Sequence, residues 1–434
     1  METSYVEELR LTSFKSFTDQ VLPLDELTLL VGRNGSGKSN ALEGLWALAR
    51  LASGEDIRDA LDGGREGPSV RGGSAGCAPF GQSSFSLGCT VLTGNRRVWL
   101  DVVVQVEPIP QVIYERLADD SRELLLTDDP SSYSSDIVAR WQNRTQGPNP
   151  ALNFRAGRLL TSQVLARVPA TRAGQTIHLA AAQVLSALRQ VFVLDPVPHM
   201  MRGYEPERDT LLHRDASNLS AAVAALLSVP DTRDRLCAAM SKLNEQEVVD
   251  VTTTRSDLGD VMLTLLERFA GQEHPVPARA MSDGSLRFLA ILVALLQAPT
   301  IDTAPERLAS EDALGQTTLV IEELENGLHA SQAQLLIGLI REEVRRRRVR
   351  VLATAHSPAL LDALRGDEHR SVVVCQRDDE SRSSLHRLVE LSDYVGVVAR
   401  GLGRSAVADR LRQTPPPTQT PSEALAEILG RAAL

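Results

Sequence analysis

The sequence predicts an α/β fold with a mostly helical segment inserted between two regular parts, and three stretches carry this prediction. Near the amino terminus, LLVGRNGSGKSNALEGLWALA passes from a strand pattern through a glycine-rich turn into a helix pattern. Nearer the other end, the apolar runs Thr318–Ile321 and Val349–Ala355 alternate with helix patterns. Short apolar runs that alternate with helices are typical of parallel strands covered on both faces.

Composition and charge are those of an ordinary globular protein. Of 434 residues, 43% are hydrophobic and 24% are charged. This length suffices for two domains or for one large head with an inserted subdomain. The 46 basic and 56 acidic residues give a formal net charge of −10, which argues against a protein that coats nucleic acid through bulk electrostatics. A local basic patch stays compatible with this balance.

The cysteines are typical of a reducing compartment, and the apolar runs are not those of a secreted or membrane protein. The four cysteines show no C-x-x-C spacing, so we expect free thiols rather than a zinc site or a disulfide framework. The first residues, METSYVEELRLTSF, lack the apolar core of a signal peptide. The longest apolar run, FLAILVALL, is much shorter than the ~20 residues of a membrane span. We therefore expect a cytoplasmic protein without a membrane partner.

The patterns divide the chain into four parts. Residues 1–106 contain strand runs, the glycine-rich turn and a β-hairpin that turns at residues 93–95. Residues 107–279 have a mostly helical pattern interrupted by prolines, without the sustained heptads of a coiled coil. Residues 280–413 return to a regular alternation of helix and strand. Residues 414–434 are expected to form a proline-rich linker and a short helix.

The glycine-rich turn fits the pattern G-x-x-x-x-G-K-[ST], which is a cradle for nucleotide phosphates in P-loop NTPases. Backbone N–H groups turn towards the phosphates in such a loop, and the amino terminus of the next helix adds its positive end. We expect Lys38 to reach the β- and γ-phosphates of ATP and the Ser39 hydroxyl to contact Mg²⁺. The predicted ATP contacts are Asn34, Gly35, Ser36, Gly37, Lys38, Ser39 and Asn40.

Two adjacent acids, Glu322 and Glu323, follow the apolar run Thr318–Ile321. The carboxyl end of a buried strand is where ligands gather in α/β sheets. One carboxylate there can hold the water shell of a metal while the other polarises an attacking water. The plainer interpretation of the same residues is a charged turn after a strand.

A histidine, His356, stands at the end of the second apolar run, before Ser357-Pro358, where a helix is expected to begin. It can hydrogen-bond a γ-phosphate and respond to its presence. Further upstream, Ser282 or Asp283 can cap the apolar helix that follows SDGS, and Gly284 allows close backbone approach. This second helix terminus is suited to an anion, although an ordinary capped helix has the same pattern.

Taken in order, these stretches resemble the ABC-type ATPase heads of the SMC/RecF/OLD group, especially stand-alone AAA-family ATPases related to OLD proteins. LRLTSFKSFTDQVLPLDELTLLVGRNGSGKSNALEGL is similar to the amino-terminal lobe of that group. SDGSLRFLA is similar to its signature motif, IEELENGLH to its Walker B and D-loop, and ATAHSP to its switch histidine. DASNLSAAVAAL resembles a further segment of the subgroup, and about half of the chain is covered.

The resemblance implies that two heads enclose two ATP molecules. Ser282, Asp283, Gly284 and Ser285 of one subunit would then touch the γ-phosphate bound by Lys38 of the other. By the same resemblance, Ser39 and Glu322 hold Mg²⁺, Glu323 activates water, Asn326 lies in the D-loop and His356 contacts the γ-phosphate. Glu322 stands where aspartate is usual and Leu324 where proline is common. Gln82 is a candidate for the Q-loop glutamine.

The resemblance does not extend to the nuclease that OLD proteins carry after the head. The acidic cluster Asp378-Asp379-Glu380 lies in a predicted hairpin turn, which is unlike a built-in metal nuclease site. The run Arg345–Arg348 is either the solvated end of a helix or a basic patch for DNA or an acidic partner. We therefore expect a separate effector protein, such as a nuclease or a toxin.

Two functions of different classes follow. In the first, an ATP-dependent homodimer acts as sensor and scaffold for a separate effector, as in anti-phage systems. In the second, a RecF-like repair ATPase clamps DNA as it dimerises. The acidic composition and the long inserted segment favour the first. A transporter motor fits poorly, because SDGS and ENGLH differ from the signature and D-loop usual in transporters.

Overall fold

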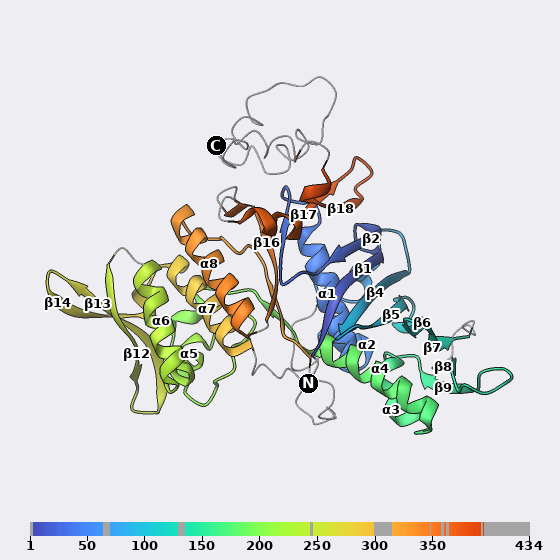
Figure 1. Ribbon diagram of the computed structural model, residues 1–434. Coiled ribbons are helices and arrows are strands. Elements are labelled where there is room, and N and C mark those ends of the chain that lie inside the picture. The colour runs from blue at the N-terminus through green and yellow to red at the C-terminus, as the bar shows by residue number, and fades with distance from the viewer. Residues whose placement is uncertain are drawn as a thin grey trace, which may run out of the picture.

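The computed structural model describes residues 3–63, 70–128, 135–243, 246–298, 315–347, 349–356, 360, 361, 364–391 and 394. Two sheets and eight α-helices organise this part of the chain (Figure 1). The helices are α1 Lys38–Ala52, α2 Ile57–Asp62, α3 Val164–Arg167, α4 Arg172–Arg189, α5 Leu219–Leu227, α6 Pro230–Leu243, α7 Asp283–Gln297 and α8 Ala330–Arg347. None of these helices combines the length and the apolar character that crossing a membrane requires.

The larger sheet has 14 strands, and its spatial order is β10-β15-β16-β3-β17-β18-β2-β1-β4-β5-β6-β7-β8-β9. Their bounds are β1 Ser4–Phe14, β2 Phe17–Pro23, β3 Leu27–Val31, β4 Ser84–Thr93, β5 Arg96–Gln105, β6 Gln111–Asp119, β7 Arg122–Thr127, β8 Asp136–Trp141, β9 Ala151–Arg155, β10 Val191–Leu194, β15 Thr318–Ile321, β16 Arg350–Ala355, β17 Val372–Arg377 and β18 Ser383–Arg387. The smaller sheet contains β11 Glu205–Pro206, β12 Glu247–Arg255, β13 Asp260–Phe269 and β14 Gln272–Pro277.

One half of the large sheet is parallel. Strands β10, β15, β16, β3 and β17 pair in parallel with their neighbours in this order. The residues of β15 and β16 are buried throughout, as expected for strands covered on both faces. The carboxyl ends of β3, β15 and β16 therefore lie at the same edge of the sheet. The parallel strands and the helices between them confirm the predicted α/β fold class.

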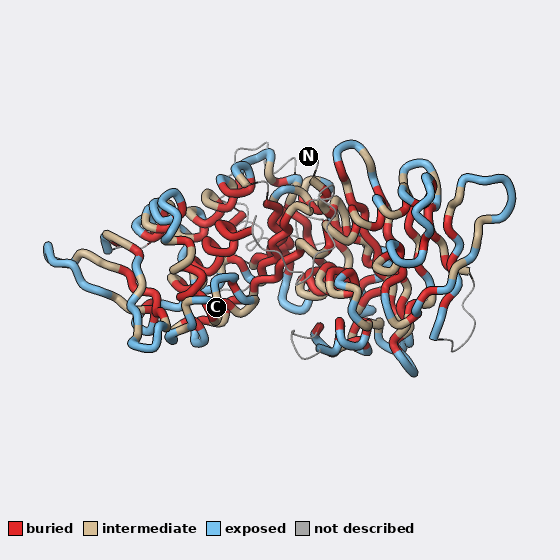
Figure 2. Tube along the Cα trace, turned by 90° about the horizontal axis from the view of Figure 1, so that it is seen from below, coloured by how far each residue is buried: buried red, intermediate tan, exposed pale blue. Residues whose placement is uncertain are grey.

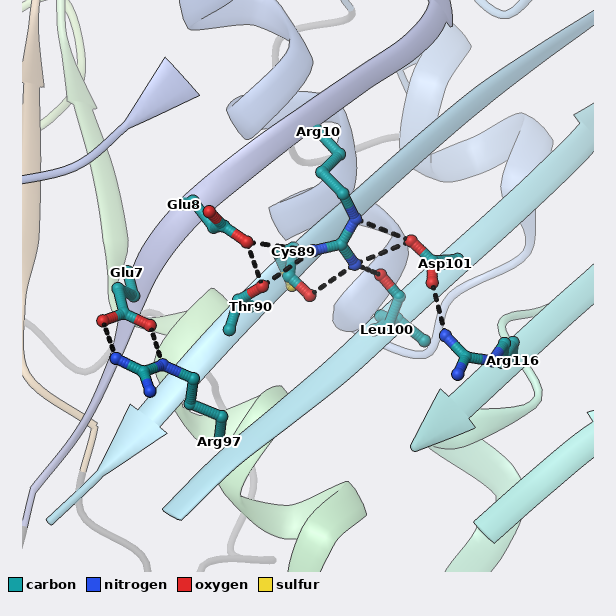
Figure 3. Close-up of polar contacts among 9 residues, drawn as sticks. All are labelled: Glu7, Glu8, Arg10, Cys89, Thr90, Arg97, Leu100, Asp101 and Arg116. Carbon is teal, nitrogen blue, oxygen red and sulfur yellow. Dashed lines mark hydrogen bonds and ion pairs between the residues drawn. The ribbon is translucent and has the colours of Figure 1, made fainter. Parts of the chain in front are cut away.

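The other half is antiparallel, from β2 through β1, β4, β5, β6, β7 and β8 to β9. The predicted hairpin is confirmed as β4–β5, in which Thr93 pairs with Arg96 across Gly94 at φ 56°. A polar network crosses this half (Figure 3). Arg10 on β1 donates to Asp101 on β5 at 2.8 and 2.6 Å, and Asp101 also lies 3.4 Å from Arg116 on β6.

The prediction that residues 107–279 are mostly helical is wrong. Their described part contains α3–α6 but also β6–β14, and most of these strands extend the two sheets. The sequence of β8, DIVARW, alternates between exposed and buried residues, which is the period of a half-buried strand. The four residues of β10 are a buried run that joins the parallel half beside β15. Residues 414–434, expected as a linker and helix, lie outside the described residues.

Apolar side chains form two cores on opposite faces of the parallel strands (Figure 2). The first core contains α1, α4 and the antiparallel half, and the second contains α5–α8 with β12 and β13. On β3, Leu30 joins the first core whereas Leu29 and Val31 join the second. This follows from the alternation of side chains along a strand. Both cores thus fix β3, the strand that leads into the glycine-rich turn.

Candidate functional site

The glycine-rich turn connects β3 to α1, and its glycines are required by their surroundings. Gly35 and Gly37 have φ of 79° and 112°, a region that glycine enters without strain. A Cβ on Gly37 would lie 2.3 Å from Ser383 Oγ, and a Cβ on Gly32 would lie 2.3 Å from the Cys375 carbonyl oxygen. The loop is therefore packed directly against β17 and β18.

Side chains from β17 and β18 hold the outer side of this turn. Ser383 Oγ donates to the Ser36 carbonyl at 2.7 Å, and Cys375 Sγ donates to the same oxygen at 3.3 Å. Asn40 Nδ2 donates to Ser16 Oγ at 2.9 Å, so the amide of this predicted ATP contact is used within the protein. Ser16 and Ser383 were not predicted, since no local pattern distinguishes them from the other serines of the chain.

Lys38 begins α1 and turns back over its own loop. Its Nζ donates to the carbonyl oxygens of Gly32 at 2.8 Å and Arg33 at 2.9 Å. Burial lowers the pKa of Lys38, while the negative charges of Glu323, Glu325 and Glu322 act in the opposite direction. The Ser36 hydroxyl is buried, and no hydrogen-bond partner for it is present among the described residues. The loop thus holds a cation and an unsatisfied hydroxyl next to four open backbone N–H groups at the start of α1.

The two adjacent acids lie in different environments. The side chain of Glu322 is 19% exposed, and Arg71 Nη2 donates to its two oxygens at 2.7 and 2.8 Å. The side chain of Glu323 is 52% exposed, and its backbone has φ 53°. Thr354 Oγ1 accepts from the Glu323 amide at 2.8 Å, and Asn326 Nδ2 donates to the Glu323 carboxylate at 3.0 Å. Glu322 is thus held by an ion pair, whereas Glu323 is more exposed, and the roles predicted for the two acids stay predictions.

His356 follows β16 and faces both the acids and the glycine-rich turn. Its Nε2 lies 3.9 Å from Glu323 Oε1, and its backbone N–H donates to Glu325. Burial lowers the pKa of His356, and the positive charge of Lys38 lowers it further. The charges of Glu325 and Glu323 and a hydrogen bond to the Gly32 backbone raise this pKa, but by less. The ring is therefore mostly neutral at pH 7. Ser357 and Pro358 lie outside the described residues.

The predicted signature residues form the amino terminus of α7. Ser282 Oγ accepts from the Ser285 amide at 3.0 Å, which confirms Ser282 as the helix cap, and Asp283 accepts from Arg202 at 2.6 Å. A Cβ on Gly284 would lie 2.3 Å from the carbonyl oxygen of Gly327, in the turn after Asn326. The signature segment and the D-loop of the same chain are therefore in direct contact.

Besides Ser16 and Ser383, three further residues of this site were not predicted, namely Arg71, Glu325 and Thr354. Arg71 comes from the glycine- and serine-rich stretch after α2 and reaches an acid 251 positions away. Such a contact has no local signal in the sequence. Gln82, the candidate for the Q-loop, accepts from Ser13 Oγ at 3.0 Å, and its role stays a prediction.

The predicted Mg²⁺ ligands, Ser39 and Glu322, would be assisted by the nucleotide. Among the described residues, no three His, Cys, Asp or Glu side chains gather in a metal-binding arrangement. Mg²⁺ commonly takes one or two protein oxygens and completes its shell with phosphate and water. Glu322 already pairs with a positive group, so its position can hold a cation.

Comparison with known proteins agrees with this arrangement. Residues 27–139 and 165–362 match the family described as "AAA domain, putative AbiEii toxin, Type IV TA system". A segment of 101 residues is 37% identical to the DNA replication and repair protein RecF of Acidothermus cellulolyticus, and it spans 23% of each protein.

Solved structures of SMC heads are also similar to the chain. An SMC head bound to the C-terminal winged-helix domain of ScpA has a TM-score of 0.45 at 12% identity and covers 88% of this chain and 97% of its own. The SMC head from Thermotoga maritima has a TM-score of 0.42 at 10% identity, with coverages of 88% and 98%.

The family match covers both the glycine-rich turn and the strands that carry Glu322 and His356. The order of these stretches agrees with the motif order on which the resemblance was based. The chain therefore belongs to the AAA-domain family named above. This match and the identity to a segment of RecF support the predicted resemblance to ABC-type ATPases of the SMC/RecF/OLD group.

Proposed function

We propose that this chain binds and hydrolyses ATP with Mg²⁺ and that two copies associate around the bound nucleotides. The observation that carries the proposal is the meeting of Lys38, Glu323 and His356 at the carboxyl ends of three neighbouring parallel strands. In α/β sheets this edge is the usual place for a ligand.

Each residue has a distinct part in the proposed reaction. Lys38 and the backbone N–H groups at the start of α1 bind the phosphates. Ser39 and Glu322 would hold Mg²⁺, which supplies positive charge against the charge that develops on the transferred phosphoryl group. Glu323 accepts the proton of the attacking water, and Asn326 orients its carboxylate. Neutral His356 is placed to hydrogen-bond the γ-phosphate.

The exposed terminus of α7 supports association of two copies. Ser282 and Asp283 are exposed, and the segment Ser282–Ser285 contacts the turn that carries Asn326. In the proposed dimer this segment binds the γ-phosphate held by Lys38 of the second copy. Nucleotide binding would then cause the two heads to associate, and hydrolysis would allow them to dissociate.

We further propose that the dimer is a cytoplasmic sensor and scaffold for a separate nuclease or toxin in anti-phage defence. The family description names a putative toxin of a toxin–antitoxin system, and this is the observation that favours a role in such a system over one in DNA repair. A net charge of −10 also favours a protein partner over DNA. The alternative is an ATPase that binds DNA upon dimerising, and the identity to a RecF segment is the observation that favours it.

Affinity purification of tagged Glu323→Gln from its native cell with ATP tests these roles. Loss of the base is expected to trap the nucleotide-bound dimer with its partner. Lys38→Ala, purified in parallel, is the control that should not form this complex. A co-purifying nuclease or toxin supports the scaffold, whereas DNA together with repair proteins supports the alternative. Wild-type hydrolysis by Glu323→Gln would contradict the assignment of the base.

A further inference from the structure

Arg71 bridges two carboxylates that lie far apart in the sequence. Its Nε lies 2.6 Å from Glu43 Oε1 on α1, and its Nη2 lies 2.7 and 2.8 Å from the oxygens of Glu322 after β15. One guanidinium thus links the helix behind the phosphate loop to the carboxylate expected to hold Mg²⁺. Arginine suits such a bridge because its planar fork presents several N–H donors in fixed directions.

The Glu43 end of this bridge is the anchor. The side chain of Glu43 is only 9% exposed, and it also pairs with Lys15, whose own side chain is 11% exposed. Lys15 Nζ donates in turn to the Arg71 carbonyl at 2.9 Å. Two cations therefore compensate the buried Glu43, so that it remains paired with Lys15 if the Arg71 guanidinium moves.

The Glu322 end is different, since Arg71 is the only partner that the described residues provide for that carboxylate. The Arg71 side chain is 60% exposed. The Arg71 guanidinium can therefore leave Glu322 and be hydrated instead, at a modest cost in free energy. Glu322, in contrast, directly follows a fully buried strand and has little freedom to move. If this contact is broken, the guanidinium is the group that moves.

We propose that Arg71 is a positioning residue that neutralises Glu322 before nucleotide binds, and that Mg²⁺ arriving with ATP replaces Arg71 on this carboxylate. The inference rests on the proposed role of Glu322 as a Mg²⁺ ligand. Two cations compete for the same two oxygens, and like charges repel at such distances. Displacement of Arg71 also releases its segment from β15, which links metal binding to a change in residues 70–77.

Arg71→Ala in the Glu323→Gln background tests this competition without interference from hydrolysis. Affinity for a fluorescent ATP analogue is measured as a function of Mg²⁺ concentration, from excess EDTA upwards. We expect Arg71→Ala to reach half of its Mg²⁺-dependent binding at roughly 10-fold lower Mg²⁺, because a charged competitor is absent. Arg71→Lys, which keeps the charge but not the fork, should lie between Arg71→Ala and the parent.

Arg97→Ala is a matched control. Arg97 donates to both oxygens of Glu7 at 2.6 and 2.8 Å, with a side chain that is 47% exposed (Figure 3). This pair has the same chemistry as Arg71–Glu322 but lies in the antiparallel half of the sheet. The Mg²⁺ dependence of Arg97→Ala should equal that of the parent.

Hydrogen exchange gives a second readout that does not depend on a substitution. In the parent, amides of residues 70–77 should exchange faster with ATP and Mg²⁺ than with ATP and EDTA. If Arg71→Ala had an unchanged Mg²⁺ dependence, or bound the Mg²⁺–nucleotide more weakly, the proposed replacement of Arg71 by Mg²⁺ would be wrong. The ATPase proposal would remain intact. A parent protein that fails to bind ATP at any Mg²⁺ concentration would overturn both.

Discussion

A glycine lies at the amino terminus of both α1 and α7, Gly37 just before the first helix and Gly284 within the second, yet only the terminus of α7 has a side-chain cap. Gly37 precedes α1 without any side-chain cap, and Lys38 lies over the loop. In α7 the Ser282 hydroxyl already accepts from the Ser285 amide. An uncapped terminus offers its N–H groups to an anion. In the proposed function, α1 therefore binds phosphate by itself, whereas α7 contributes only when a second copy approaches.

The strongest test of this contrast is Lys38→Ala. The variant loses charge-assisted contacts of about 1.5–3 kcal/mol each, so ATP affinity should fall at least about 100-fold. Isothermal titration calorimetry with ATP and Mg²⁺ measures this loss. Wild-type affinity in the folded variant would mean that the phosphate site lies elsewhere.

Ser285→Arg should distinguish the role of the α7 terminus from that of the α1 terminus. The variant should bind ATP within about 3-fold of wild type, because α1 is unchanged, but ATP-dependent association and hydrolysis should fall roughly 10-fold or more. Sedimentation and phosphate release measure the two effects. Ser121→Arg, on the exposed β6–β7 turn, is the control for added charge. If Ser285→Arg lost ATP binding instead, α7 would belong to the same nucleotide site as α1.

Gly284→Ala should have a smaller effect, transmitted through the D-loop. Its Cβ would lie 2.3 Å from the Gly327 carbonyl, so the turn that carries Asn326 must shift. Such overpacking costs about 1–3 kcal/mol, and hydrolysis should fall several-fold while ATP affinity holds. Gly338→Ala is the control, because nothing lies within 4 Å of a Cβ there. Equal hydrolysis rates in both variants would show that the contact has no part in catalysis.

The smallest expected effect concerns the charge of His356. Burial and Lys38 lower its pKa, so it should titrate below the usual value of about 6.5 and gain its proton only as the pH falls through that lower range. Removing the Lys38 charge should raise this pKa, and removing the Glu323 charge should lower it. Histidine-selective NMR titration, assigned with His356→Gln, measures these shifts. A pKa above 6.5, or no response to Lys38→Ala, would contradict the proximity of these groups.

Local sequence patterns were sufficient to predict the parts of the site that lie at the ends of helices and strands. The turn before Lys38, the acids after β15 and the histidine after β16 each combine an apolar run with a polar residue at its end. Because parallel strands share one edge, their meeting could be inferred without coordinates. The β4–β5 hairpin was predictable for the same reason, as it is local.

Contacts between distant segments were not predictable from such patterns. Arg71 binds Glu322 and Ser383 binds Ser36 across more than 200 positions, and neither Arg71 nor Ser383 belongs to a recognisable motif in its own stretch. Strands β6–β9 were missed although β8 has the alternation of a strand, because short runs between prolines and polar stretches were assigned to a helical segment. The buried run of β10 follows α4 after a single residue, so it was taken as part of a helical segment.

The most direct test of the account is the mass of Glu323→Gln in solution, measured by light scattering with and without ATP and Mg²⁺. We expect a single chain without nucleotide and two chains with it, and Lys38→Ala should remain a single chain under both conditions. A Glu323→Gln variant that binds ATP yet keeps the same mass would contradict the claim that nucleotide joins two heads.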